Sequence, residues 1–304
     1  MSAAALGLTA LSYLIGAVLL GANLFLHRPP LLLLGRVLGV AGAVFHAGAI
    51  GLRCVELHRA PFTTPAESLS LLGWLLALGY LGTELLFRLS AAGPFALGLS
   101  FLLVVLGGVL GNGASGGPNT ALLNSNAVSL HILATVGALG MFALAACCGA
   151  LYLASHRVLK GRHGLSWMKR LPPLTTVETA AFTLVAVGFP LLTLGILAGF
   201  ARALQGDLAA GWQTDPKALL AYAVWFVYGA YLVARLALNW TPQRTSYVLL
   251  AGLGLSLLLL LVPSGAHRFD QRAQNEQSAI VAHGVHLGMS NAPLLGSRST
   301  RTLR

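Results

Sequence analysis

The sequence has very few charged residues for its length. Only 9% of its 304 residues are Asp, Glu, Lys or Arg, whereas a soluble domain carries about 25%. Hydrophobic residues make up 56% of the chain, and the mean hydropathy is +0.78. A soluble fold has no means of burying this much apolar surface. The composition therefore predicts an integral membrane protein whose surroundings are the lipid bilayer.

Cysteine is also scarce, and acidic residues are outnumbered by basic ones. The three cysteines, Cys54, Cys147 and Cys148, include no CxxC pair, which argues against disulfide chemistry. The formal charge is +11, but the basic residues lie in short loops and in the C-terminal tail. That distribution is typical of membrane topology, so we expect no nucleic-acid partner. The sequence shows no paired carboxylates, nucleophile elbow or zinc signature, so a hydrolase is the least favoured class.

Several apolar runs are long enough to cross a bilayer as an α-helix, which takes about 20 residues. Eight such runs lie at about 5–26, 32–55, 68–88, 94–111, 127–154, 177–202, 217–238 and 245–263. They do not alternate polar with apolar residues, and an open sheet edge is too costly in lipid. We predict an all-α fold, a polytopic transmembrane helix bundle of about eight spans within 1–265. Residues 268–304 are polar and are predicted to form a flexible tail.

One basic segment sets the predicted orientation in the membrane. The loop expected at 156–170 contains five basic residues and no acid, so it is predicted to be cytoplasmic. Alternation of the spans then places both termini outside, together with the loops at 56–67, 112–126 and 203–216. The arginines of the tail do not follow this rule, and we give them less weight than the short internal loop.

Glycine pairs at four-residue spacing occur in three of the runs. They are Gly35 with Gly39, Gly107 with Gly111, and Gly195 with Gly199. Such pairs permit close contact between helices in lipid. The alternative is that they reflect only the general abundance of glycine in membrane helices.

Three of the nine histidines stand at informative positions. His46 lies midway along its run, where an ionisable side chain is costly and indicates function; a neutral histidine bonded to a neighbouring helix is the alternative. His131 begins the fifth span and His267 follows the eighth, so the predicted topology puts both at the outer face. Two neutral imidazoles facing each other across a gap make a suitable axial pair for haem iron.

The segment Gly-Trp-Gln-Thr-Asp-Pro-Lys at 211–217 lies on the same predicted face. Asp215 followed by Pro216 predicts a helix start, with Asp as the N-cap and Pro at the first helical position. Trp212 precedes it as an interfacial aromatic, and Trp225 and Tyr228 follow within the helix. On spacing alone, the segment indicates a capped helix with aromatic anchors.

These segments together resemble the cytochrome c assembly protein family, the haem-handling membrane proteins of the CcsA, ResC, CcmC and HemX kind. Family members carry a tryptophan-rich outer loop that ends in W-x-W-D-P-K-E, and the segment from Gly211 to Ala218 stands in its place. His131, in Ser-Leu-His-Ile, and His267, in Ser-Gly-Ala-His, resemble the two outer haem-ligand histidines of the family. We therefore assign 126–267 to an assembly-like core, and the first four spans match more loosely.

The resemblance implies a haem-handling factor for cytochrome c biogenesis in the bacterial inner membrane. Haem b, bound non-covalently, would lie on the outer loop at Trp212 and Asp215, with its iron ligated by His131 and His267. His46 resembles a family histidine that holds haem within the membrane during transit. The partners implied are apocytochrome c and a second membrane subunit of the haem-attachment system. The chain is not expected to be an enzyme alone.

Charged residues near the outer segment complete this interpretation. Arg202, Lys217 and Arg268 are placed by charge and sequence position to pair with the haem propionates.

The sequence also departs from the family pattern. Thr214 replaces the second motif tryptophan, Ala218 replaces the acid after the lysine, and Val233 stands near a second intramembrane histidine of the synthases. The weakened loop favours the HemX-like branch, which is associated with control of tetrapyrrole biosynthesis. A membrane regulator or scaffold acting through the basic loop is therefore the alternative function. A small-molecule transporter is the second alternative, although the sequence shows no inverted repeat.

Overall fold

The protein is helical throughout the part of the chain that the computed structural model describes, which is residues 2–57, 64–111, 126–160, 172–205 and 215–262. Within these residues there is no β-strand, and eight helices are long and apolar enough to cross a membrane. They are α1 (Ser2–Leu26), α2 (Pro29–Leu57), α3 (Pro65–Phe87), α4 (Gly93–Gly111), α6 (Asn126–Lys160), α8 (Leu174–Gln205), α9 (Pro216–Leu236) and α10 (Pro242–Leu261), with a short 3₁₀ helix, η1 (Ser90–Ala92), before α4. The predicted all-α membrane bundle is confirmed.

Proline and short polar side chains mark several helix starts. α3 begins with a capping box, in which the Glu67 backbone N–H donates to Thr64 Oγ1 and the Thr64 N–H donates to Glu67 Oε2, both at 3.2 Å. Proline occupies the first turn of α3, α9 and α10, where its missing N–H costs nothing. These residues fix where α3, α9 and α10 begin.

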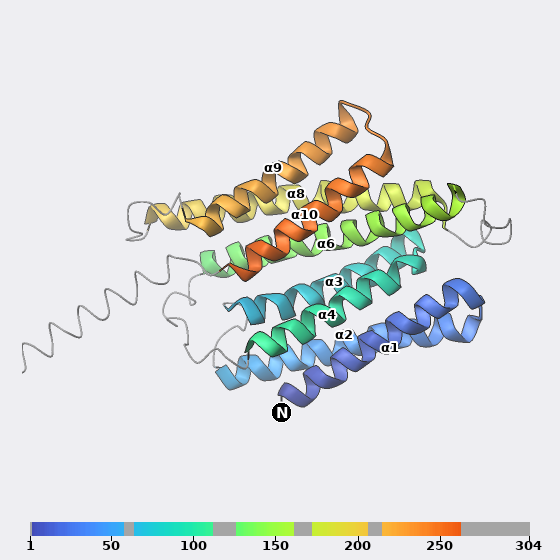
Figure 1. The fold of residues 1–304 in the computed structure, drawn as a ribbon. Helices are drawn as coiled ribbons and strands as arrows, with labels where there is room; N and C mark the ends of the chain where they lie inside the picture. The colour runs from blue at the N-terminus through green and yellow to red at the C-terminus, as the bar shows by residue number, and fades with distance from the viewer. Residues whose placement is uncertain (1, 58–63, 112–125, 161–171, 206–214, 263–304) are drawn as a thin grey trace, which may run out of the picture. The chain divides into compact units, whose positions relative to one another are not determined.

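α6 is the central helix of the unit formed by residues 1–263. Inside the protein, 72% of its apolar stretch is buried, compared with 22% to 44% for the other spans. The helices α1 to α4 pack on one another, α6 packs on α3 and also on α8 and α10, and α9 packs on α10 and α8 (Figure 1). Because α6 is shared by both groups, its position determines that of its neighbours.

The glycine pairs are points of close helix contact, as their spacing predicted. In each pair at least one member leaves no room for a side chain: a Cβ atom would lie 2.7 Å from the nearest facing atom at Gly35, 2.8 Å at Gly107 and 2.6 Å at Gly195. Helices in lipid gain much of their association energy from such close packing.

The segment expected to be a loop from His156 onward was placed too early. α6 continues to Lys160, so His156, Arg157 and Lys160 are helical. Arg and Lys favour helix formation, and their charge interacts favourably with the negative end of the helix dipole. The remainder of the basic segment, residues 161–170, lies outside the described residues.

Candidate functional site

His131 lies in the second turn of α6 and faces α8. Its Nδ1 is 2.6 Å from the backbone oxygen of Gly195. A carbonyl oxygen only accepts, so Nδ1 carries the proton and donates it, and the lone pair of the neutral ring lies on Nε2. The described residues give Nε2 no hydrogen-bond partner. A neutral imidazole with an unprotonated Nε2 is a form in which histidine ligates metals.

Asp215 begins α9, as predicted. Its Oδ1 accepts from the backbone N–H of Lys217 at 2.8 Å, and Pro216 occupies the first helical position. The N-cap role is therefore confirmed, whereas contact between Asp215 and haem stays a prediction. Trp212, His267 and the propionate candidate Arg268 lie outside the described residues. The other two propionate candidates lie in helices, Arg202 near the end of α8 and Lys217 in the first turn of α9.

Three helix contacts place the start of α9 and the end of α10 at the end of the bundle where His131 lies. Trp225 Nε1 donates to Thr193 Oγ1 at 2.9 Å, and one turn further along α9 Gly229 faces Phe189, so α8 and α9 are antiparallel. Gly149 in the second half of α6 packs on the first half of α10, so these helices are antiparallel too. In Figure 1 the first turns of α6 and α9 and the last turn of α10 share one end.

His46 is fully buried, and both of its ring nitrogens are engaged. Nε2 is 2.9 Å from Ser70 Oγ, and Nδ1 is 3.3 Å from Tyr13 Oη, with the two rings edge to face. The side chain thus joins α1, α2 and α3 by hydrogen bonds, in agreement with the alternative given for it above. Ligation by His46 requires one of these bonds to break.

Two acid–base pairs inside the bundle were not anticipated from the sequence. Glu84 in α3 accepts from Arg36 Nε and Tyr80 Oη, each at 2.6 Å. Glu178 in α8 pairs with Arg235 in α9. The available signal was an acid inside an apolar run, which requires a partner. The partner itself was not readable, because it lies on another helix far along the chain.

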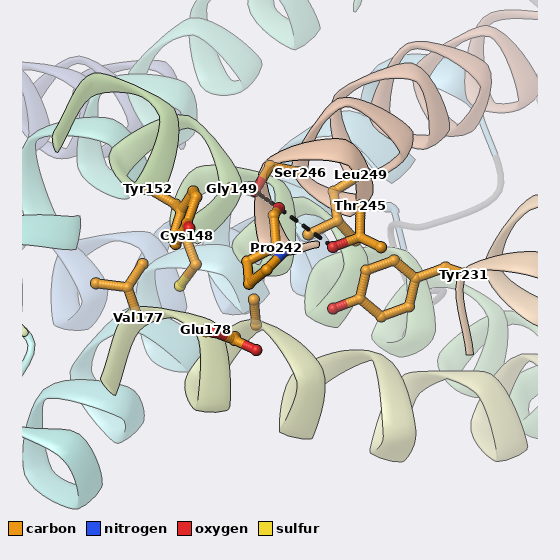
Figure 2. A pocket seen from close by; sticks show the side chains of 11 residues that line it. Cys148, Gly149, Tyr152, Val177, Glu178, Tyr231, Pro242, Thr245, Ser246 and Leu249 are labelled. Atoms are coloured by element: carbon orange, nitrogen blue, oxygen red, sulfur yellow. Dashed lines mark hydrogen bonds between the residues drawn. The ribbon is translucent and has the colours of Figure 1, made fainter. Parts of the chain in front are cut away.

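A small cavity lies beside Glu178, between α6, α8, α9 and α10 (Figure 2). Its volume is about 10 Å³, which is room for about one water molecule. Thr245 and Ser246 on its wall donate their hydroxyls to the backbone oxygen of Pro242. The cavity is far too small for a tetrapyrrole, and it lies toward the end of the bundle opposite His131.

A model of the family described as cytochrome C assembly protein matches residues 58–265 of the chain. The chain belongs to the cytochrome c assembly protein family. For this cytochrome c assembly protein, the match contains His131 and the whole segment 211–218. His46 precedes the matched region, and His267 stands just beyond its end.

Curated relatives of this cytochrome c assembly protein include proteins named CcsA and a protein named HemX. The "Cytochrome c biogenesis protein CcsA" of Guillardia theta is 27% identical over 224 residues, which are 67% of this chain and 73% of that protein. The CcsA of Thermosynechococcus vestitus is 36% identical over 87 residues, 29% of this chain and 27% of its own. "Protein HemX" of Brevibacillus brevis is 27% identical over 183 residues, 58% of this chain and 64% of its own.

Proposed function

We propose that this protein handles haem for cytochrome c biogenesis, holding haem b non-covalently at the outer face of the bacterial inner membrane between His131 and His267. The observation that carries the proposal is the hydrogen bond from His131 Nδ1 to Gly195, which leaves Nε2 as the unprotonated nitrogen. It occurs at the position where the family resemblance requires a ligand. The end of α10, from which the chain continues to His267, lies at the same end of the bundle.

The charge distribution supports placing this end outside. Among the Lys and Arg side chains that the structure describes, those at the end opposite His131 are Arg28, Arg36, Arg88, Arg157, Lys160, Arg235 and Arg244. Those at the His131 end are Arg53 and Lys217. Basic residues concentrate on the cytoplasmic side of membrane proteins, which supports the proposal that the His131 end of the bundle and both termini are outside.

The remaining parts of the site follow from this placement. Haem would supply the iron for the two histidines and a ring for Trp212 to contact. Asp215 caps the start of α9 and thereby positions Lys217, which would pair with a propionate. Apocytochrome c would receive the haem outside the membrane, with a second membrane subunit completing the attachment system. His46 would serve in transit only after its bonds to Tyr13 or Ser70 break.

Visible spectra of the protein purified in mild detergent test the proposal. The wild type, loaded with haem, is expected to give sharp reduced bands of low-spin bis-histidine haem. His131→Ala and His267→Ala should lose or shift these bands. His46→Ala should keep them, because both nitrogens of His46 are already engaged. His156→Ala, at the opposite end of α6, is the matched control and should match the wild type.

Two results of these spectra would contradict the proposed outer haem site. A wild type that stays colourless after haem is added would refute haem handling. Loss of the bands only in His46→Ala would move the site into the membrane and exclude the outer pair.

The match to HemX favours one second candidate, a membrane regulator of tetrapyrrole biosynthesis that acts through the basic loop. Thr214 in place of the second motif tryptophan is consistent with it. In that case Arg162→Gln, Lys169→Gln and Arg170→Gln together should change the cellular amount of an early biosynthetic enzyme, while His131→Ala should not. The opposite pattern would eliminate the regulator.

A further inference from the structure

A glycine of α8 lies directly against the ring of His131. A Cβ atom built at Gly199 would lie 2.8 Å from Cε1 and 2.9 Å from Nδ1 of His131, but 3.7 Å from Nε2. The Cε1–Nδ1 edge of the imidazole therefore rests on Gly199, and Nε2 is the nitrogen farther from this contact. Any larger residue at 199 would push the ring out of its present position.

The second glycine of the pair brings the acceptor within reach. A Cβ atom at Gly195 would lie 2.6 Å from Thr135 Oγ1 and 3.2 Å from the Thr135 backbone nitrogen. The missing side chain thus lets α6 and α8 approach each other. As a result, the Gly195 carbonyl oxygen lies 2.6 Å from Nδ1 of His131, one turn before Thr135.

We propose that Gly195 and Gly199 are positioning residues that hold His131 in its Nδ1–H tautomer and so present the Nε2 lone pair as the ligand. This inference rests on the function proposed above, and it concerns how the ligand is prepared. An imidazole without such an acceptor also populates the Nε2–H form, in which Nε2 has no lone pair to offer. Removing a carbonyl or carboxylate partner of a metal-ligating histidine typically lowers metal affinity about 10- to 100-fold.

Gly199→Ala separates this role from simple helix packing. The atoms that its Cβ would strike belong to the His131 ring, which can rotate away. A Cβ at Gly195 would instead strike Thr135 Oγ1 and also lie 3.2 Å from the Thr135 backbone nitrogen, which cannot rotate away. The variant should thus displace the ring and break its bond to Gly195 while the helices keep their spacing. Gly254→Ala is the matched control, because a Cβ atom at this exposed helical glycine meets nothing within 4 Å.

The first measurement is the ¹⁵N NMR spectrum of haem-free protein whose histidine rings carry ¹⁵N. The spectrum is recorded at a pH at which the His131 ring is neutral. His131→Gln identifies the signal. The wild type and Gly254→Ala should show a protonated Nδ1 and a bare Nε2, and Gly199→Ala should lose this preference. In haem titrations Gly199→Ala should bind about 10- to 100-fold more weakly than both.

Chemical rescue provides a test that does not depend on the folding of Gly199→Ala. In His131→Gly, added imidazole can donate its N–H to Gly195 and ligate through its other nitrogen, so it should restore the haem bands. 1-Methylimidazole has no N–H to donate to Gly195. It should therefore need at least about tenfold higher concentration to restore the haem bands, as expected when a ligating imidazole lacks its carbonyl partner. Equal rescue by the two compounds would overturn the inference.

The outcomes distinguish this inference from the proposed function. If His131→Ala abolishes haem binding but Gly199→Ala changes neither tautomer nor affinity, the function stands and the positioning role is wrong. If the wild type binds no haem, the proposed haem-handling function is wrong. The NMR spectrum of the haem-free protein still tests the positioning role. If the His131 ring of the wild type is then protonated on Nε2, the positioning role is overturned. If it is protonated on Nδ1 in the wild type and in Gly254→Ala but not in Gly199→Ala, the positioning role is supported.

Discussion

His131 and His46 differ in how their two ring nitrogens are used. One ring nitrogen of His131 is hydrogen-bonded to a backbone oxygen of α8, whereas both ring nitrogens of His46 are hydrogen-bonded to side-chain hydroxyls. Sequence position drew attention to His46 because it is an ionisable group in the middle of an apolar run, and to His131 because it stands at the predicted outer end of the fifth span. It did not indicate their partners, since Gly195 is 64 residues from His131 and Tyr13 is 33 residues from His46.

A hydroxyl deletion tests the structural role of His46. Ser70→Ala removes the partner of Nε2 and leaves a buried polar nitrogen unpaired. The loss of stability is expected to be about 0.6 to 2 kcal/mol, the range found for hydrogen bonds between helices in membranes. Thermal unfolding in detergent measures it.

A second serine variant serves as the control for this prediction. Ser100→Ala, in α4, removes a buried hydroxyl for which the structure shows no hydrogen-bond partner, and it should change the unfolding midpoint less. A Ser70→Ala protein as stable as the wild type would show that the bond to His46 contributes nothing measurable.

At the scale of helices, the sequence was most informative about where spans lie and least about where they stop. All eight expected runs became helices, because a length of about 20 apolar residues is dictated by the bilayer itself. α6 and α8 run past the ends of their apolar stretches, to Lys160 and Gln205. Outside the hydrocarbon core of the bilayer, helix propensity and local hydrogen bonding determine where a helix ends. The length of an apolar run does not predict this end.

Neighbouring glycines of α4 test the helix contacts. A Cβ atom at Gly107 would lie 2.8 Å from the Ala66 backbone oxygen, whereas one at Gly108 meets nothing within 4 Å. Gly107→Ala should force α3 and α4 apart and destabilise the protein by about 1 to 3 kcal/mol, the usual cost of overpacking. Gly108→Ala should be close to neutral, and equal unfolding midpoints for the two variants would contradict the contact.

At the scale of the whole molecule, the two ends of the bundle differ in chemistry. The end that carries His131 has few described basic side chains, while the opposite end holds most of them together with the two acid–base pairs. The sequence predicted this polarity only through the basic segment after α6. The structure adds the helix pairings that bring the other arginines to the same end.

Cysteine labelling tests the orientation. In a protein with Cys54→Ser, Cys147→Ala and Cys148→Ala, a membrane-impermeant thiol reagent should modify Ser115→Cys in intact cells. Ala237→Cys, at the exposed end of α9, should react only after the membrane is opened. The reverse pattern would place His131 on the cytoplasmic side and end the proposal of an outer haem site.

The burial of α6 has a consequence for how the protein is made. During synthesis α6 leaves the ribosome after α1 to α4 but before α8 and α10, the helices that later cover much of it. Its central stretch, with the small residues Ala143, Ala145 and Ala146, lacks those partners until α8 and α10 have been made. Because α6 is as apolar as the other spans, a nascent chain that stops after it would hold the helix in lipid with its packing surface uncovered. Small residues on a helix surface permit close approach of another helix, so this intermediate is open to contacts with the wrong partner.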